Sequence, residues 1–376
     1  MELTTSAAPQ TTIPDETPLL YNKHAVKLPF TFDVAQLQAE LAQIPAEAWQ
    51  VHYNSKEYEG DWAVAPLRSV AGHPGIIYAV LGAGNDGFYK NTIYLEQSPC
   101  MRSVAEQMKS PVGAMRLMRL GPGAKILEHK DDMGTESFRE FRLHVPIVTN
   151  PDVKFMVDGQ RVNMQPGELW YADFGKIHSV DNDGDTERVH LVIDCLADEN
   201  LLKTINDAIE FEMIEQFLNG IGIPTAEGVI EEDTFLPGVL IHNGTITYDR
   251  TKIASPGDLL HEAGHIAVSK TPETIGGNVG AAQPTNQAMG EEIATILWSY
   301  AALNAIGLNV KSVFHDLGYK GASDWHIDLM KSGQFNGLPL LEWMGMTASP
   351  AKAEKLGVPP FPHMLHWLRP VVVYEE

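Results

Sequence analysis

The sequence predicts two domains of different fold class, an antiparallel β sandwich or barrel followed by a mainly helical α+β domain. A chain of 376 residues is longer than one ordinary domain and comfortable for two. Up to about residue 200, short apolar segments alternate with Gly and Pro, which is typical of antiparallel strands joined by turns. Beyond that point, apolar residues recur at helical spacing. We expect a flexible leader at 1–24, the β domain at 25–200, a helix and linker at 201–225, and the second domain at 226–376.

The elements of the first domain follow from their own patterns. Segment 28–49 begins as a strand and becomes an amphipathic helix, because Val34, Leu37, Leu41 and Ile44 recur three and four residues apart. Short segments of strand character then follow at 75–81, 114–120, 124–130, 141–148, 154–159, 167–173 and 188–195. In the first domain, Asp158-Gly159 predicts the turn of a β-hairpin.

The second domain should contain one strand region and several long helices. The segment VLIHNGTITYD reads as strand. Helical spacing predicts helices at 201–220, 257–270, 286–306 and 322–332.

Composition and charge exclude several classes of partner. The net charge is -22 and the sequence contains no cluster of Lys and Arg, which disfavours binding to the phosphate backbone of a nucleic acid. The first twenty residues lack the pattern of a signal peptide, and no stretch reaches the roughly 18–20 apolar residues of a membrane span. Cys100 and Cys195 cannot form a disulfide framework. We expect a cytoplasmic protein that acts on a small molecule or peptide, without nucleic-acid or membrane partners, and a homodimer remains open.

The first candidate site begins with an H-x-D pair. His129 and Asp131 lie two apart at the end of an expected strand, so both side chains project to one face. His178, after a second strand, is the natural third ligand, and two His with one carboxylate make the facial triad of non-haem Fe(II) oxygenases. With 14 histidines, about one H-x-D is expected by chance, and a second copy occurs at His326 and Asp328. That copy is rejected because it lies in a helical region without a following strand that carries His and Arg.

Three basic residues strengthen the first copy. Arg188 lies ten residues after His178, where a buried guanidinium could hold a carboxylate of 2-oxoglutarate with two parallel hydrogen bonds. Arg142 and His144 lie two apart on another strand and share a face. Together they predict a cationic pocket beside the metal, as a dianionic co-substrate needs.

These residues resemble those of the aspartyl/asparaginyl β-hydroxylases, which have the cupin-like double-stranded β-helix (jelly-roll) fold. The resemblance covers roughly 28–197 and includes FTFDVAQLQAELAQI, LGPGAKILEHKDD, FRLHVPI and GELWYADFGKIHSVDNDGDTERVHLVIDC. It implies a hydroxylase that uses Fe(II), 2-oxoglutarate and O2, with flanking helices around the β-helix. By this likeness, the iron ligands are His129 and His178, and the 2-oxoglutarate ligands are Arg188, Arg142 and His144. The animal protein hydroxylases of the family have Gly where this chain has Asp131, so a full triad is expected here.

A second candidate site is the sequence HEAGH. His261 and His265 are four apart on an expected helix and can chelate one Zn(II), while Glu262 can act as general base on a metal-bound water. The third ligand would be Glu291 or Glu292 on the next long helix, and the sequence does not decide between them. This part resembles the minimal zincin metallopeptidase core over about 236–306.

Three interpretations of the whole chain follow. In the first, a hydroxylase of an amino acid or peptide-like molecule carries a metallohydrolase domain for the same pathway. In the second, the HEAGH domain only recognises substrate or forms a dimer. In the third, the chain is a zinc metallopeptidase with the β domain as a binding module, which would require His129, Asp131, His178 and Arg188 to be coincidental.

Overall fold

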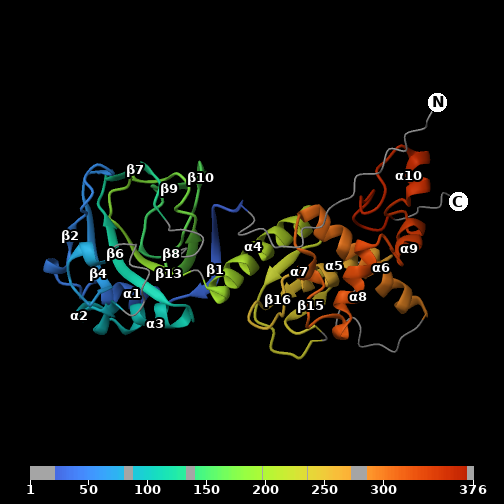
Figure 1. Ribbon diagram of the computed structural model, residues 1–376, viewed down its shortest axis with the longest axis horizontal. Helices are drawn as coiled ribbons and strands as arrows, with labels where there is room; N and C mark the ends of the chain where they lie inside the picture. Colours follow the sequence, from blue (N-terminus) through green and yellow to red (C-terminus); the bar gives the residue numbers. More distant parts are fainter. Residues whose placement is uncertain are drawn as a thin grey trace. The chain divides into compact units, whose positions relative to one another are not determined.

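The chain forms two compact units whose boundary lies between Ile209 and Glu210, within helix α4 (Glu199–Gly220) (Figure 1). The computed structural model describes residues 22–79, 88–132, 140–196, 198–234, 236–271 and 286–370. Among these residues, no helix combines the length and apolar character needed to cross a bilayer.

The N-terminal unit contains two antiparallel sheets with a shared core. The larger follows the order β1-β11-β8-β13-β6-β4-β2, with β5 paired to β4, and the smaller follows β10-β9-β12-β7-β3. The larger sheet consists of β1 (Ala25–Thr31), β2 (Gln50–Val51), β4 (Trp62–Val70), β5 (Tyr89–Asn91), β6 (Val112–Leu120), β8 (Glu140–Val148), β11 (Glu168–Ala172) and β13 (Arg188–Leu196). The smaller consists of β3 (Tyr58–Glu59), β7 (Lys125–His129), β9 (Val153–Val157), β10 (Gln160–Arg161) and β12 (His178–Asn182).

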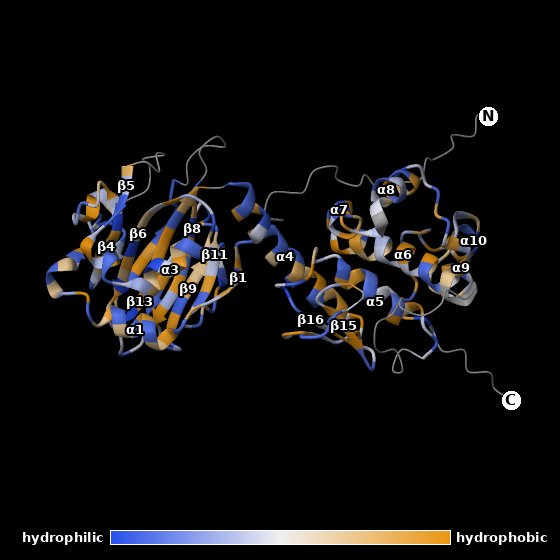
Figure 2. Ribbon diagram, turned by 90° about the horizontal axis from the view of Figure 1, so that it is seen from below, coloured by the Kyte–Doolittle hydropathy of each residue, from blue (hydrophilic) through white to orange (hydrophobic). Residues whose placement is uncertain are grey.

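The central strands of the larger sheet are covered on both faces. Eight of the nine residues of β13 are buried, which fits its nearly continuous apolar run. Helix α1 (Val34–Leu41), capped by Asp33, packs against β8 and against α3 (Pro99–Gln107). Short helical turns complete this unit at η2 (Ala46–Ala48), η3 (Ile76–Ala79) and α2 (Ile93–Glu96). Figure 2 shows hydrophobic residues along β9 and β13. The core that the two sheets share includes Leu120 of β6, Ile126 of β7 and Phe155 of β9.

The predicted hairpin is confirmed and one predicted strand is wrong. Val157 pairs with Gln160 across Asp158 and Gly159, whose φ angles of 52° and 72° suit a two-residue hairpin turn. By contrast, the apolar run predicted as a strand at 75–81 forms the 3₁₀ turn η3, and its last two residues lie outside the described part of the chain. The cause is tertiary, because the side chain of Gln50 accepts a hydrogen bond from the backbone N–H of Ile76 (3.0 Å).

The C-terminal unit is mainly helical around a small sheet. Helices α5 (Asp258–Val268) and α6 (Asn286–Ile306) pack against each other, and the sheet has the order β14-β16-β15. Gly264 allows this approach, since a Cβ there would lie 2.8 Å from Thr295 Cγ2. The remaining elements are β14 (Thr225–Glu227), β15 (Val239–His242), β16 (Thr245–Tyr248), α7 (Val310–Val313), η6 (Tyr319–Gly321), α8 (Ser323–Lys331), α9 (Leu338–Trp343) and α10 (Pro350–Leu356).

Candidate metal centres

Strand pairing brings together the three residues of the predicted triad. His129 ends β7 and is the register partner of His178, which begins β12. Asp131 follows β7, where its backbone N–H donates to the carbonyl of Phe174 (2.9 Å). One potential ligand atom from each of these three side chains lies within 4.8 Å of the other two. The spacing fits a single metal ion.

Backbone carbonyls fix the rings of both histidines. Nδ1 of His129 donates to the carbonyl of Leu127 (2.7 Å), and Nδ1 of His178 donates to the carbonyl of Lys176 (3.1 Å). Because a carbonyl only accepts, each Nδ1 carries the proton and each Nε2 presents a lone pair. Burial lowers the pKa of His178 to about 4, so this ring is in the neutral, metal-binding form at pH 7.

A cavity of about 290 Å³ adjoins the triad and is lined by all six residues predicted for this site. Its inner wall carries Arg188, which is 2% exposed and whose pKa burial lowers to about 9, so it remains charged at pH 7. Arg188 Nε and His144 Nε2 are buried without a hydrogen-bond partner among the described residues. Buried polar groups of this kind are costly unless a ligand satisfies them. The charged N–H donor of Arg188 suits a small anion.

Arg142 lies between the metal triad and a buried carboxylate. Its Nε donates to Oδ1 of Asp194 (2.8 Å), and its Nη1 donates to Oδ2 of Asp131. Arg116 donates to the other oxygen of Asp194 (2.5 Å). Asp131 is therefore held by Arg142 on one oxygen, while its Oδ1 lies 3.7 Å from Nε2 of His129. Arg142 lines the cavity and also orients the carboxylate of Asp131.

A buried chain of three side chains defines the protons on His144. Arg188 Nη2 donates to Nδ1 of His190 (2.9 Å), so this nitrogen is an acceptor. Nδ1 of His144 lies 3.2 Å from the same atom and must therefore donate to it. Burial, with Arg188 next, lowers the pKa of His144 well below its usual value, so its Nε2 is an unprotonated acceptor that faces the cavity.

The second constellation comes together in the C-terminal unit. Nε2 of His261 lies 3.7 Å from Oε1 of Glu292, and Nε2 of His265 lies 3.4 Å from Oε2. These three residues form a possible metal site among the described residues, and Glu291 is not part of it. Nδ1 of His261 is 3.1 Å from the Tyr319 hydroxyl, which orients the ring from the side away from Glu292.

Burial controls ionisation around HEAGH. It lowers the pKa of His261 to about 3 and that of His265 to about 4, so both rings are neutral at pH 7. Burial, followed by the charges of Glu292 and Asp258, raises the pKa of Glu262 to about 8. Without a metal, this carboxyl is therefore mainly protonated at pH 7.

The family model of the aspartyl/asparaginyl beta-hydroxylases matches residues 32–198. This range contains every residue of the first site and none of the second. It spans less than half of the chain, and no curated protein matches the sequence.

Solved structures show weaker likenesses. A 2OG-Fe(II) oxygenase family oxidoreductase from Burkholderia pseudomallei is 17% identical, with 46% of this chain and 86% of that chain covered and a TM-score of 0.34. A prolyl-4-hydroxylase from Pseudomonas putida is 13% identical, with 47% and 94% covered and a TM-score of 0.32. A viral collagen prolyl hydroxylase from Paramecium Bursaria Chlorella virus-1 is 8% identical, with 48% and 100% covered and a TM-score of 0.31. Scores this low carry no argument about the chemistry of this chain.

Three buried residues of the matched range that belong to this site were not predicted from the sequence: Arg116, His190 and Asp194. His190 and Asp194 share the inward face of β13 with Arg188, because they lie two and six residues further along the strand. Polar residues at even spacing in an otherwise apolar strand are the signal that could have identified them.

Proposed function

We propose that the N-terminal unit is an Fe(II)- and 2-oxoglutarate-dependent hydroxylase of an amino acid or peptide-like small molecule. The observation that carries the proposal is the convergence of His129, Asp131 and His178 on a cavity whose inner wall holds the buried Arg188. The family match over 32–198 supports the same chemistry.

The residues present fit iron. Two neutral imidazoles and one carboxylate are the facial ligand set of non-haem Fe(II) oxygenases. His129 and His178 would contribute Nε2, because their Nδ1 atoms already donate to carbonyls. Asp131 would contribute Oδ1, since its Oδ2 accepts from Arg142. Three ligands leave further positions for a co-substrate and O2.

The cavity also fits a dicarboxylate. Arg188 has an unpaired buried Nε, and its Nη2 is already fixed by His190, so the guanidinium is oriented before a ligand arrives. Arg188 would hold the carboxylate remote from the metal. His144 would contact the co-substrate closer to the metal, and a carboxylate oxygen there requires a proton on His144 Nε2.

Bound iron and 2-oxoglutarate supply the oxygen chemistry: 2-oxoglutarate and O2 yield succinate and CO2, while one oxygen atom enters a C–H bond of the substrate. The chain supplies orientation and shielding. Arg142 holds Asp131 in place, and the rings of Phe155, Phe174 and Trp62 line the cavity and limit water there.

Substitution of the triad tests this proposal, and the chain offers a matched control. We expect His178→Ala to abolish iron binding and succinate formation from 2-oxoglutarate, because one of three ligands is lost. His326→Ala, in the second H-x-D pair, removes a half-buried imidazole from a different unit and should change neither. Undiminished succinate formation in His178→Ala would contradict the proposal, as would the absence of 2-oxoglutarate turnover with Fe(II) and O2 in the unsubstituted protein.

A second candidate function belongs to the C-terminal unit, which we propose to be a zincin-like metallohydrolase. The supporting observation is the mutual approach of His261, His265 and Glu292, a donor set that suits Zn(II). Zinc would supply an activated water, and Glu262 would accept its proton. Among the two glutamates left open by the sequence, the distances favour Glu292 over Glu291 as third ligand.

Glu262→Gln separates the interpretations of this unit. It should abolish hydrolysis of peptide or amide substrates while leaving succinate formation by the N-terminal unit intact. An unchanged rate of hydrolysis would remove Glu262 from the mechanism. If the unsubstituted protein hydrolyses nothing, substrate recognition or dimerisation becomes the better account of this domain.

A further inference from the structure

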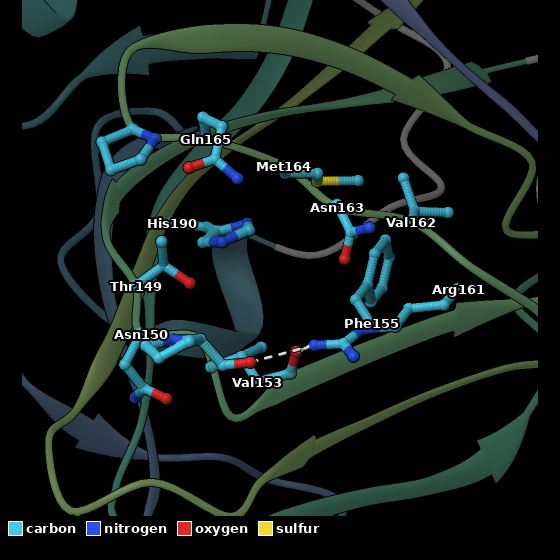
Figure 3. A pocket seen from close by; sticks show the side chains of 12 residues that line it. Thr149, Asn150, Val153, Phe155, Arg161, Val162, Asn163, Met164, Gln165 and His190 are labelled. Atoms are coloured by element: carbon cyan, nitrogen blue, oxygen red, sulfur yellow. Dashed lines mark hydrogen bonds between the residues drawn. The ribbon is translucent and has the colours of Figure 1, made fainter.

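The N-terminal unit contains a second cavity, of about 340 Å³, that the proposed hydroxylase does not use (Figure 3). It is formed by Thr149, Asn150 and Pro151 after β8, by Val153 and Phe155 of β9, and by residues 161–166 at and after the end of β10. Phe155 lines both this cavity and the metal-site cavity, so the two are close neighbours. We call it the β8–β10 cavity.

The inner wall of the β8–β10 cavity presents an N–H group of a buried residue. His190 is 2% exposed, and Figure 3 shows its ring projecting into the cavity. Its Nδ1 accepts from Arg188, so in the neutral ring the proton resides on Nε2. Nε2 has no hydrogen-bond partner among the described residues. A donor that opens onto a cavity without a protein partner is available to a ligand oxygen.

The rim of the cavity carries a cation without a counter-charge. Nη2 of Arg161 donates to the carbonyls of Pro151 and Val153 (3.0 and 2.9 Å), one of which is drawn in Figure 3. Within the described part of the chain, no carboxylate lies within ion-pairing distance of Arg161. The twelve lining residues include no Asp or Glu, although the chain has 49 acidic against 27 basic residues. This local departure from the acidic surface favours an anion.

We propose that the β8–β10 cavity is a second ligand site, which binds a small dicarboxylate between Arg161 and the Nε2–H of His190. One carboxylate pairs with the fixed guanidinium at the rim, and an oxygen of the other accepts from His190. The neutral side chains of Thr149, Asn163 and Gln165 supply further hydrogen bonds on the walls.

The same histidine connects this ligand to the metal-site cavity. A ligand that accepts from Nε2–H polarises the imidazole and makes Nδ1 a better acceptor for Arg188 and His144. Occupation of the β8–β10 cavity should therefore strengthen binding at the first cavity, and the effect must be reciprocal. This coupling rests on the proposed 2-oxoglutarate site, whereas binding in the β8–β10 cavity does not.

Succinate serves as the probe, and calorimetric titration of the full chain as the measurement. The co-substrate site is first saturated with Ni(II) and N-oxalylglycine, so that succinate meets only unoccupied sites. We expect one further equivalent to bind, with succinamide, the uncharged analogue of equal size, at least tenfold weaker. Arg161→Ala, at an exposed position, should weaken succinate binding at least tenfold, and His190→Phe should do the same. Lys154→Ala, which removes an exposed cation from neighbouring β9, should leave it unchanged.

The outcomes distinguish this site from the hydroxylase site. The proposal is overturned if no further equivalent of succinate binds, or if binding persists in Arg161→Ala. If N-oxalylglycine does not bind at all, the proposed 2-oxoglutarate site fails, but succinate binding that Arg161→Ala abolishes would still establish the β8–β10 site. If both bind, succinate should tighten N-oxalylglycine binding in the unsubstituted chain and not in Arg161→Ala, and an absence of this difference refutes the coupling.

Discussion

Replacement of Glu262 by Gln should stabilise the metal-free C-terminal unit, although it removes a residue proposed for catalysis. Glu262 is 5% exposed, and burial with the nearby charges of Glu292 and Asp258 raises its pKa from 4.5 to about 8. The folded protein therefore keeps a proton that the unfolded chain releases above pH 4.5. Gln has the shape of the protonated carboxyl and needs no proton.

The size of the effect follows from the difference in pKa. When a group has a higher pKa in the folded than in the unfolded state, the free energy of unfolding falls as pH rises between the two pKa values. For Glu262 this window runs from 4.5 to about 8. Each pH unit in that window costs about 1.4 kcal/mol, so at pH 7 the native carboxyl costs roughly 3 kcal/mol relative to Gln. Below pH 4.5 both states are protonated, and the two proteins should be equally stable.

Urea unfolding at several pH values, with hydrogen exchange of peptides from α5 and α6, measures the free energy of unfolding of this unit separately. Both proteins are treated with a chelator. The difference between them should be near zero at pH 4 and grow to roughly 3 kcal/mol at pH 7. Added Zn(II) should reduce it, because a cation beside His261 and His265 favours the ionised carboxylate.

If the free energies of unfolding of the two proteins changed with pH in the same way, this reasoning would be refuted, because Glu262 would then ionise normally inside the fold. A less stable Gln variant at every pH would also refute it. Glu291→Gln, one residue before the proposed third ligand, is the control and should show no comparable pH-dependent gain.

Four further predictions concern the two metal sites. Asp194→Asn should destabilise the N-terminal unit by about 3 kcal/mol and weaken iron binding, because the buried Arg116 and Arg142 lose their shared carboxylate. Urea unfolding measures the first effect and iron titration the second. Binding of 2-oxoglutarate should take up about one proton at pH 7 and weaken as pH rises, because the neutral His144 must gain a proton to become a donor. Calorimetry in buffers of different ionisation enthalpy should show this proton uptake, and the His144→Phe variant should show none. Tyr319→Phe should weaken zinc binding about tenfold in a chelator competition, since His261 loses the partner that orients it, and unchanged affinity would contradict that role. Iron(II) and 2-oxoglutarate should each tighten binding of the other at least tenfold, which iron titration with and without N-oxalylglycine measures.

Strand character in the N-terminal half and helical character in the C-terminal half could be read from local patterns, and the structure confirms both. The run at 75–81 shows where this method fails. Its apolar residues are compatible with a strand, but Gln50 accepts from the backbone N–H of Ile76, twenty-six residues later and the first residue of η3, and this makes a helical turn more favourable. Long-range hydrogen bonds of this kind leave no trace in a local pattern.

The third ligand of HEAGH shows a second limit. Glu291 and Glu292 are neighbours on α6, so their side chains point about 100° apart around the helix axis. The choice between them depends on how α6 crosses α5, and this is set by the close approach at Gly264 and Thr295. The sequence identifies the helix, but only tertiary packing decides which residue of the pair faces His261.

The network around Arg142 could not be derived from one sequence, because it depends on strand order. β13 lies between β8 and β6, and this order alone brings Asp194 between Arg142 and Arg116. The least exposed charged groups of the metal-site cavity and its support are Arg116, Arg142 and Arg188, against the carboxylates of Asp194 and Asp131. Glu57 and Asp132 also line the cavity but are more exposed to solvent. The five least exposed groups carry a net charge of +1. Fe(II) alone would raise this net charge to +3, whereas Fe(II) together with a dianion would leave it at +1. The buried charges therefore favour the pair of ligands over the metal alone, because uncompensated charge in a low-dielectric site is expensive.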